Sequence, residues 1–197
     1  MQTKQVINDS SLIFEFKIDN IPSEEIIMDE LNYSHIKENS RNVFDSKKMY
    51  IDELKPLMEC FKDELIYDVV SKMYESNETI MQRLWPFNKN RYGVFGNFLK
   101  EYTCIVTSIF LDTPGFELPK HIDNRFTVAN FILNLIDNPA STKFYDCRND
   151  SKLIYEAPKE KGTGIFFLNY ENNYHSYNND TNQNRYAMIS SIILNLP

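Results

Sequence analysis

Hydrophobic positions change their spacing about halfway along the chain. From Tyr102 onward, β-branched and aromatic residues gather in short runs bounded by Pro, Gly, Asn and Asp. Many short strands, separated by turns at intervals of about ten residues, are typical of a β-sandwich or barrel. The runs predict strands over residues 102–111, 116–123, 126–136, 142–146, 151–156, 163–168 and 185–194.

The first part of the chain follows a different pattern. Apolar and polar residues alternate within 11–18, which predicts a strand. Ser23, followed by two glutamates, predicts the start of a helix that runs to about Leu31. Residues 32–48 are polar and mixed in charge, and they predict a loop or a short edge strand.

The clearest helical pattern spans Ile51 to Met73. Its apolar residues recur every three or four positions, so one face is expected to pack on the outside of a sheet. Residues 78–85 predict a short helix that ends before Pro86. The sequence therefore predicts one mainly β domain with flanking helices, residues 1–197. A mostly helical flanking region with an N-terminal strand would occupy 1–100, and the β core 101–197.

The composition narrows the class of function. The chain has 197 residues, 14% of them aromatic, and a formal net charge of −7 at pH 7. General nucleic-acid binding is not expected, because gripping phosphates requires a basic surface. The three cysteines form no CxxC pair, and no segment has the pattern of a signal peptide or a membrane span. We expect a cytoplasmic protein with free thiols and no membrane contact; the sequence indicates no oligomeric state.

The candidate chemistry lies in the strand-rich half. His121 and Asp123 are two positions apart, so on a strand their side chains would leave the same face. His175 follows after several further predicted strands, which can return it to the same place. Two imidazoles and one carboxylate with open positions are the ligand set of non-haem Fe(II) oxygenases. The remaining histidine, His35, is interpreted as exposed or hydrogen-bonded.

Three segments extend this pattern. Residues 111–123 (LDTPGFELPKHID) read as a turn and strand that lead into the first two ligands, 162–169 (GTGIFFLN) as the strand before His175, and 185–194 (RYAMISSIIL) as a closing strand that begins with Arg185. The ordered set of triad, arginine and strands resembles the Fe(II)/2-oxoglutarate-dependent dioxygenases, in particular their prolyl-hydroxylase-like branch. The resemblance covers about half of the chain.

The resemblance implies a fold and a reaction. The fold is a double-stranded β-helix, which is a cupin-like jelly-roll. His121, Asp123 and His175 would be the catalytic metal ligands for Fe(II), with 2-oxoglutarate as cosubstrate and O2 as co-reactant. Arg185 would hold the distal carboxylate of 2-oxoglutarate through a two-pronged contact. Asp123 favours hydroxylation, because the related halogenases lack that carboxylate. Ala187 is a departure, since many relatives have a serine or threonine there.

Further residues are candidates for binding. Asn130 and Asn134 share one face of a predicted strand, where their amides would bond the cosubstrate or the iron ligands, or else backbone and solvent. Asn124 and Arg125 directly follow Asp123 and are candidates for substrate contact. The segment from Trp85 to Gly96 is either a substrate-facing loop or a connection that covers the core.

The expected reaction is hydroxylation of a C–H bond. The preferred substrate is a peptide or protein side chain, and a small metabolite is the second class. The first alternative is a non-enzymatic cupin-like jelly-roll protein that binds a metal or another ligand, and the second is a structural β-sandwich. Arg185 separates them, because the neighbouring predicted strands offer no obvious carboxylate at its depth. A buried guanidinium needs an anionic partner, which would then be the cosubstrate.

Overall fold

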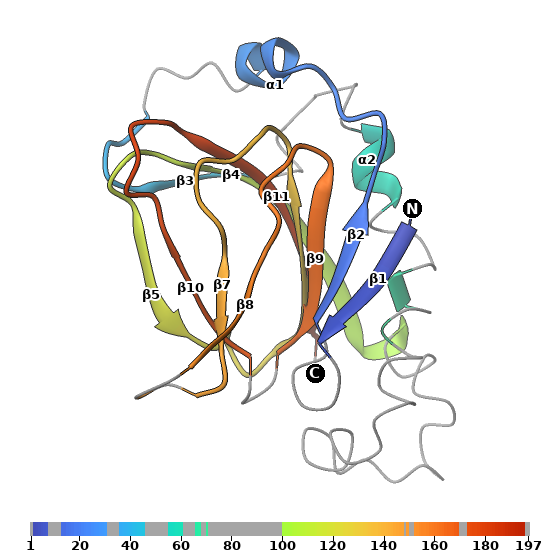
Figure 1. Ribbon diagram of the computed structural model, residues 1–197. Helices are drawn as coiled ribbons and strands as arrows, with labels where there is room; N and C mark the ends of the chain where they lie inside the picture. The colour runs from blue at the N-terminus through green and yellow to red at the C-terminus, as the bar shows by residue number, and fades with distance from the viewer. Residues whose placement is uncertain are drawn as a thin grey trace, which may run out of the picture.

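The computed structural model describes residues 2–7, 13–30, 36–45, 55–60, 66–67, 70, 100–147, 149, 152–169 and 173–195. Two β-sheets make up most of this structure (Figure 1). In spatial order, the larger sheet contains β1 (Gln2–Ile7), β2 (Ile13–Lys17), β9 (Thr163–Leu168), β6 (Thr127–Asn134), β11 (Arg185–Leu194), β4 (Thr103–Asp112) and β3 (Arg41–Asp45). The smaller sheet contains β5 (Glu117–His121), β10 (Tyr174–Asn178), β7 (Lys143–Tyr145) and β8 (Leu153–Glu156).

Every strand pair in both sheets is antiparallel. The smaller sheet lies over one face of the larger one, as Figure 1 shows. This arrangement confirms the mainly β jelly-roll fold that the sequence predicts. The observed bounds of β9 and β11 coincide with the predicted strands 163–168 and 185–194.

Strand β11 shows how the sequence pattern builds two surfaces. It pairs with β4 on one side and with β6 on the other. Its even-numbered residues Tyr186, Met188, Ile192 and Leu194 belong to the main hydrophobic core. Its odd-numbered residues face the smaller sheet, where Arg185, Ile189 and Ser191 line a cavity. The period of two along a strand therefore separates the core face from the face that carries the site.

The main core lies between the larger sheet and the helices. Ile27 of helix α1 (Glu24–Glu30) and the helical residues Ile66 and Val70 are buried in one cluster with sheet residues such as Ile109. Burying each such side chain contributes about 1.5–3 kcal/mol. Ile66 and Val70, which belong to the predicted helix 51–73, thus pack outside the sheet as expected. Helix α2 (Lys55–Cys60) also lies within this predicted span.

The N-terminal region contains more β-structure than predicted. Strand β2 and helix α1 lie where the sequence places them, and the Ser23 hydroxyl accepts the Ile26 amide at 3.4 Å at the start of the helix. Strand β1, which pairs with β2, was not predicted. Within 32–48, the short edge strand is the correct alternative: β3 pairs with β4. The described part of 1–100 therefore adds three strands to the larger sheet.

Some predicted features lie outside the described residues. They are His35, the short helix 78–85 and the segment from Trp85 to Gly96. Among the residues that are described, no helix has the length and apolar character needed to cross a membrane.

Candidate active site

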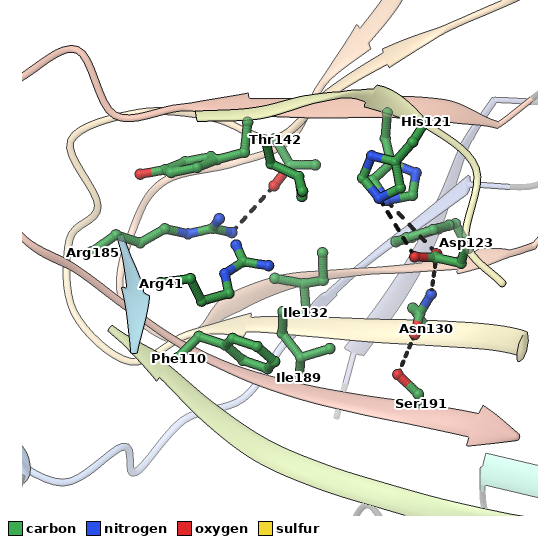
Figure 2. A pocket seen from close by; sticks show the side chains of 14 residues that line it. Arg41, Phe110, His121, Asp123, Asn130, Ile132, Thr142, Arg185, Ile189 and Ser191 are labelled. Carbon is green, nitrogen blue, oxygen red and sulfur yellow. Dashed lines mark hydrogen bonds and ion pairs between the residues drawn. The ribbon is translucent and has the colours of Figure 1, made fainter. Parts of the chain in front are cut away.

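A cavity of about 190 Å³ lies between the two sheets (Figure 2). In Figure 2, Arg185, Arg41 and Thr142 gather at one end, and His121 and Asp123 lie at the other. The wall between these ends is apolar and includes Phe110, Ile132, Leu118, Phe167 and Ile189. The cavity thus has a histidine end and an arginine end, which are two different kinds of binding site.

The histidine end brings the three predicted metal ligands together. Strands β5 and β10 pair so that His121 and His175 are direct cross-strand partners, with ring centroids 4.3 Å apart. Asp123 is placed by the turn after β5, although the sequence predicted a strand through this position. Its carboxylate oxygens lie 3.6 Å from His121 Nε2 and 3.7 Å from His175 Nε2. One potential ligand atom from each of the three residues lies within 4.8 Å of the others.

Backbone carbonyls set the orientation of both imidazoles. His121 Nδ1 lies 2.8 Å from the Pro119 carbonyl, and His175 Nδ1 lies 3.1 Å from the Asn173 carbonyl. A carbonyl only accepts, so each Nδ1 carries a proton, and in the neutral form of each imidazole the Nε2 lone pair is free. In metal-binding histidines, the ring nitrogen that does not bind the metal typically makes such a hydrogen bond, which fixes the tautomer.

The surroundings of the triad shift the pKa values of its three residues. Burial lowers the pKa of His175, so its imidazole stays neutral and ready to coordinate. The nearby Asp123 carboxylate raises the pKa of His121, despite partial burial. Burial acts to raise the pKa of Asp123, but the hydrogen-bonding contact with His121 and the electrostatic effect of the neighbouring histidines together lower it. A carboxylate that stays ionised is the form that binds a cation.

Two amides hold Asp123 in place. Asn130 Nδ2 donates to Asp123 Oδ2 at 2.5 Å, and Asn130 Oδ1 accepts the Ser191 hydroxyl. Asn169 Oδ1 accepts the Asp123 backbone amide at 3.1 Å, while Asn169 Nδ2 donates to carbonyls of the same turn. For Asn130, a contact with an iron ligand was one of the contacts expected from the sequence, whereas Asn169 was missed. The only signal for Asn169 was an amide directly after a predicted strand.

The arginine end is built around a buried guanidinium. Arg185 is almost completely buried at the start of β11, and its Nη2 donates to Thr142 Oγ1 at 3.2 Å. Its guanidinium lies over the Tyr177 ring, 4.0 Å from the centroid. Arg185 Nε and the Tyr177 hydroxyl are buried without a hydrogen-bond partner among the described residues. Unpartnered polar atoms in a cavity wall are positions where a polar ligand can bind.

The expectation that no carboxylate lies at the depth of Arg185 is wrong. Asp112, the last residue of β4, is fully buried, and its Oδ2 lies 3.4 Å from Arg185 Nη1. Its main partner is Arg41, whose Nε and Nη2 donate to the two carboxylate oxygens at 2.6 and 2.8 Å. Arg41 was missed because it lies in the polar stretch 32–48, and only the pairing of β3 with β4 brings it here.

The hydroxyl group that contacts Arg185 does not come from position 187, where many of the dioxygenases that the sequence resembles have a serine or threonine. Ala187 is buried and has no hydroxyl to offer. Thr142, in the segment before β7, supplies the hydroxyl that contacts the arginine. No local signal could indicate it, because the contact joins β11 to the segment before β7, which is far away in the sequence.

The remaining candidates lie outside the cavity. Asn134 shares the strand with Asn130, but its Nδ2 donates to the Pro158 carbonyl at 2.8 Å and its Oδ1 accepts the Asn138 amide at 2.5 Å. This is the contact with backbone that the sequence left open as the alternative for Asn134, and Asn134 does not line the cavity, because the cavity does not extend along the whole strand. Its contact with the cosubstrate stays a prediction. Asn124 and Arg125 are exposed in the turn after Asp123 and do not line the cavity.

Comparisons with known proteins detect similarity in structure only. No protein-family model matches the sequence, and no curated protein matches it. The solved structures that match include a viral collagen prolyl hydroxylase from Paramecium bursaria Chlorella virus-1 in a 2OG complex. Its TM-score is 0.53 at 12% identity, over 93% of this chain and 96% of that chain.

Two further matches widen the comparison. A prolyl hydroxylase from Trichoplax adhaerens, in complex with a hypoxia inducible factor peptide fragment, has a TM-score of 0.50 at 14% identity, over 91% of this chain and 83% of that chain. The non-haem alpha-ketoglutarate-dependent epimerase SnoN from nogalamycin biosynthesis has a TM-score of 0.54 at 9% identity, over 92% and 78%. The chain therefore has the fold of the Fe(II)/2-oxoglutarate-dependent oxygenases, with prolyl hydroxylases among its neighbours, as its sequence resemblance indicates.

Proposed function

We propose that this protein is an Fe(II)- and 2-oxoglutarate-dependent oxygenase that hydroxylates a C–H bond. One observation carries the proposal: a His–Asp–His triad and a buried arginine lie at the two ends of a single cavity. A plain metal site would use the first of these and would have no need of the second.

The donor set fits a divalent iron. Two imidazole nitrogens and one carboxylate on one side of an ion leave the other positions for exchangeable ligands. The His–Asp separations of 3.6 and 3.7 Å are within the roughly 4 Å that two metal–ligand bonds of about 2 Å can span. With Fe(II), 2-oxoglutarate and O2 bound, the site would supply the oxidant for C–H hydroxylation. The chain's own part is to hold both Nε2 atoms and the Asp123 carboxylate at fixed positions.

The arginine end fits a carboxylate. A planar guanidinium can contact both oxygens of a carboxylate at once, and it loses little hydration when it does so in a closed site. Arg185 keeps an unpartnered Nε there. The apolar wall formed by Ile132 and Ile189 suits the methylene groups that separate the two ends of 2-oxoglutarate. An enclosed cavity of roughly 150 Å³ already accepts a benzene-sized molecule, so the volume is adequate.

The substrate would approach over the histidine end. The side chains of His121 and Asp123 are 31% and 24% exposed, whereas those of His175 and Arg185 are only 7% and 3% exposed. Asn124 and Arg125 lie in the turn directly after Asp123 and are exposed, so both stay candidates for substrate contact. We favour a peptide or protein side chain as substrate, since the Trichoplax neighbour was solved with a peptide fragment. A small metabolite is the second class.

One observation favours a non-enzymatic alternative. Asp112 gives Arg185 a carboxylate neighbour within the protein, so a buried arginine does not by itself require 2-oxoglutarate. A cupin-like protein that only binds a metal would keep the triad and use the arginine as part of its core. Turnover separates the two functions.

The test is succinate formation by the Fe(II)-loaded protein with 2-oxoglutarate and O2, measured over a panel of peptides and a panel of metabolites. If the protein is an oxygenase, succinate should form in proportion to the O2 consumed. A member of one of the two panels should increase the rate of succinate formation. His175→Ala should abolish it, and Lys143→Met, which removes an exposed charge paired with Glu156 at 3.7 Å, should not. Metal binding without succinate under any condition would favour the alternative.

A further inference from the structure

Three charged residues form a row across the larger sheet at the arginine end. Asp112 on β4 is the direct cross-strand partner of Arg41 on β3 and also of Arg185 on β11. Directly opposed residues have Cβ atoms about 4.5–5.5 Å apart, and they project from the same face. A single carboxylate therefore lies between two arginines, and a small rotation of its side chain lets it pair with either of them.

The carboxylate is shared unequally. Both of its oxygens accept from Arg41, at 2.6 and 2.8 Å, which are the distances of strong charge-assisted hydrogen bonds. Arg185 has only one contact with it, at 3.4 Å, through Nη1. Arg41 and Asp112 thus neutralise each other, and the excess positive charge of the row resides on Arg185.

Arg41 is held in this arrangement by packing. Its guanidinium lies 4.7 Å from the centroid of the Phe110 ring and 4.8 Å from that of Phe116. Cation–π contacts of this kind stabilise a guanidinium where it lies. Phe110 belongs to the same strand as Asp112, and it also lines the cavity. Arg41 therefore has a fixed position between two rings, at the edge of the sheet, from which it reaches Asp112.

We propose that Arg41 is a positioning residue that occupies Asp112 and so leaves Arg185 free to bind the carboxylate of a ligand. The inference rests on the proposed function, because that ligand is 2-oxoglutarate. Without Arg41, Asp112 would be a buried carboxylate whose nearest cation is Arg185. A buried charge without a partner is costly, so the carboxylate would turn to Arg185 and compete with the ligand for the guanidinium. Edge strand β3 would thereby control cosubstrate affinity from outside the triad.

The test is a double-mutant cycle of 2-oxoglutarate affinity, measured by anaerobic calorimetry on the Fe(II)-loaded protein. Arg41→Met should weaken 2-oxoglutarate binding by at least about tenfold. Asp112→Asn should bind it as well as wild type or better. The double variant Arg41→Met/Asp112→Asn should regain most of the lost affinity, because the competing carboxylate is gone. Lys143→Met is the matched control for loss of one positive charge, and it should bind like wild type.

Folding and function are checked separately. The midpoint of thermal unfolding and the Fe(II) affinity report whether each variant retains the fold and the triad. Arg41→Lys, which keeps the charge but not the two-pronged contact, should fall between wild type and Arg41→Met. Undiminished affinity in Arg41→Met, or no recovery in a folded double variant, would overturn the role of Arg41 while leaving the proposed function intact. Wild-type protein that binds Fe(II) but no 2-oxoglutarate would overturn both.

Discussion

Asn130 offers a sensitive test of how the fold supports the proposed metal ligands. Its amide donates to Asp123 Oδ2 at 2.5 Å, and its carbonyl oxygen is held by the Ser191 hydroxyl. Asn130→Ala removes a hydrogen bond to an ionised group without touching any of the three ligands. Such bonds contribute about 1.5–3 kcal/mol. Loss of a group that orients a metal ligand typically weakens metal binding by roughly 10- to 100-fold.

The two magnitudes agree, because a factor of 10–100 in affinity corresponds to about 1.4–2.8 kcal/mol.

Two further variants sharpen the expectation. Asn130→Asp places a second carboxylate against Asp123, so its effect should be at least as large as that of alanine. Ser191→Ala leaves the Asn130–Asp123 contact in place and removes only its support, so its effect should be smaller. The assay is competition with a chelating dye for Fe(II) under anaerobic conditions, with Mn(II) as an oxygen-stable check.

Asn134→Ala is the control for this series. Asn134 lies on the same strand but bonds Pro158 and Asn138 away from the cavity. Its loss should lower the free energy of unfolding and leave metal affinity unchanged. If Asn130→Ala binds Fe(II) as tightly as wild type, the account of how Asp123 is oriented is refuted. Equal losses in Asn130→Ala and Asn134→Ala would also refute it, because they would show a general effect of destabilisation.

The other predictions concern the two ends of the cavity. His121→Ala, Asp123→Ala and His175→Ala should each greatly weaken Fe(II) binding in the dye competition assay, and an unchanged affinity in all three would remove the metal site. Arg185→Ala should leave Fe(II) binding nearly intact but weaken 2-oxoglutarate binding by roughly 2–5 kcal/mol, with Arg185→Lys only partly restoring it, as measured by calorimetry. Fe(II) affinity should fall as the pH falls, because protonation of His121 competes with the metal. Since the Asp123 carboxylate raises the pKa of His121, the decline should begin above the ordinary pKa of 6.5, and an affinity that is flat down to that pH would contradict this.

The sequence predicted most of the β core because its signals are local. Strands such as 163–168 and 185–194 are runs of β-branched and aromatic residues between turns, and their bounds match β9 and β11. The triad could also be identified, since two of its residues are close in sequence and the third follows a recognisable strand. The structure brings all three residues together as the sequence suggested.

The arginine end could not be predicted in the same way. Its central contact joins Arg41 to Asp112, residues that are far apart in sequence and meet through strand register. Local composition indicated either a loop or an edge strand around Arg41, and gave no register for that strand. The contact of Thr142, in the segment before β7, with Arg185 on β11 was missed for a similar reason. The contrast between Asn130 and Asn134 is another case, because a period of two assigns a face and does not say how far along it a cavity extends.

The proposed function requires that Fe(II) and 2-oxoglutarate bind together in the cavity between the triad and Arg185. The most direct measurement is an anaerobic titration of 2-oxoglutarate into the Fe(II)-loaded protein, followed by the visible metal-to-ligand charge-transfer absorption. We expect a saturable band with one 2-oxoglutarate per iron, which is absent in His175→Ala and needs a much higher 2-oxoglutarate concentration in Arg185→Ala. Fe(II)-loaded protein that develops no band and shows no calorimetric binding of 2-oxoglutarate would contradict it.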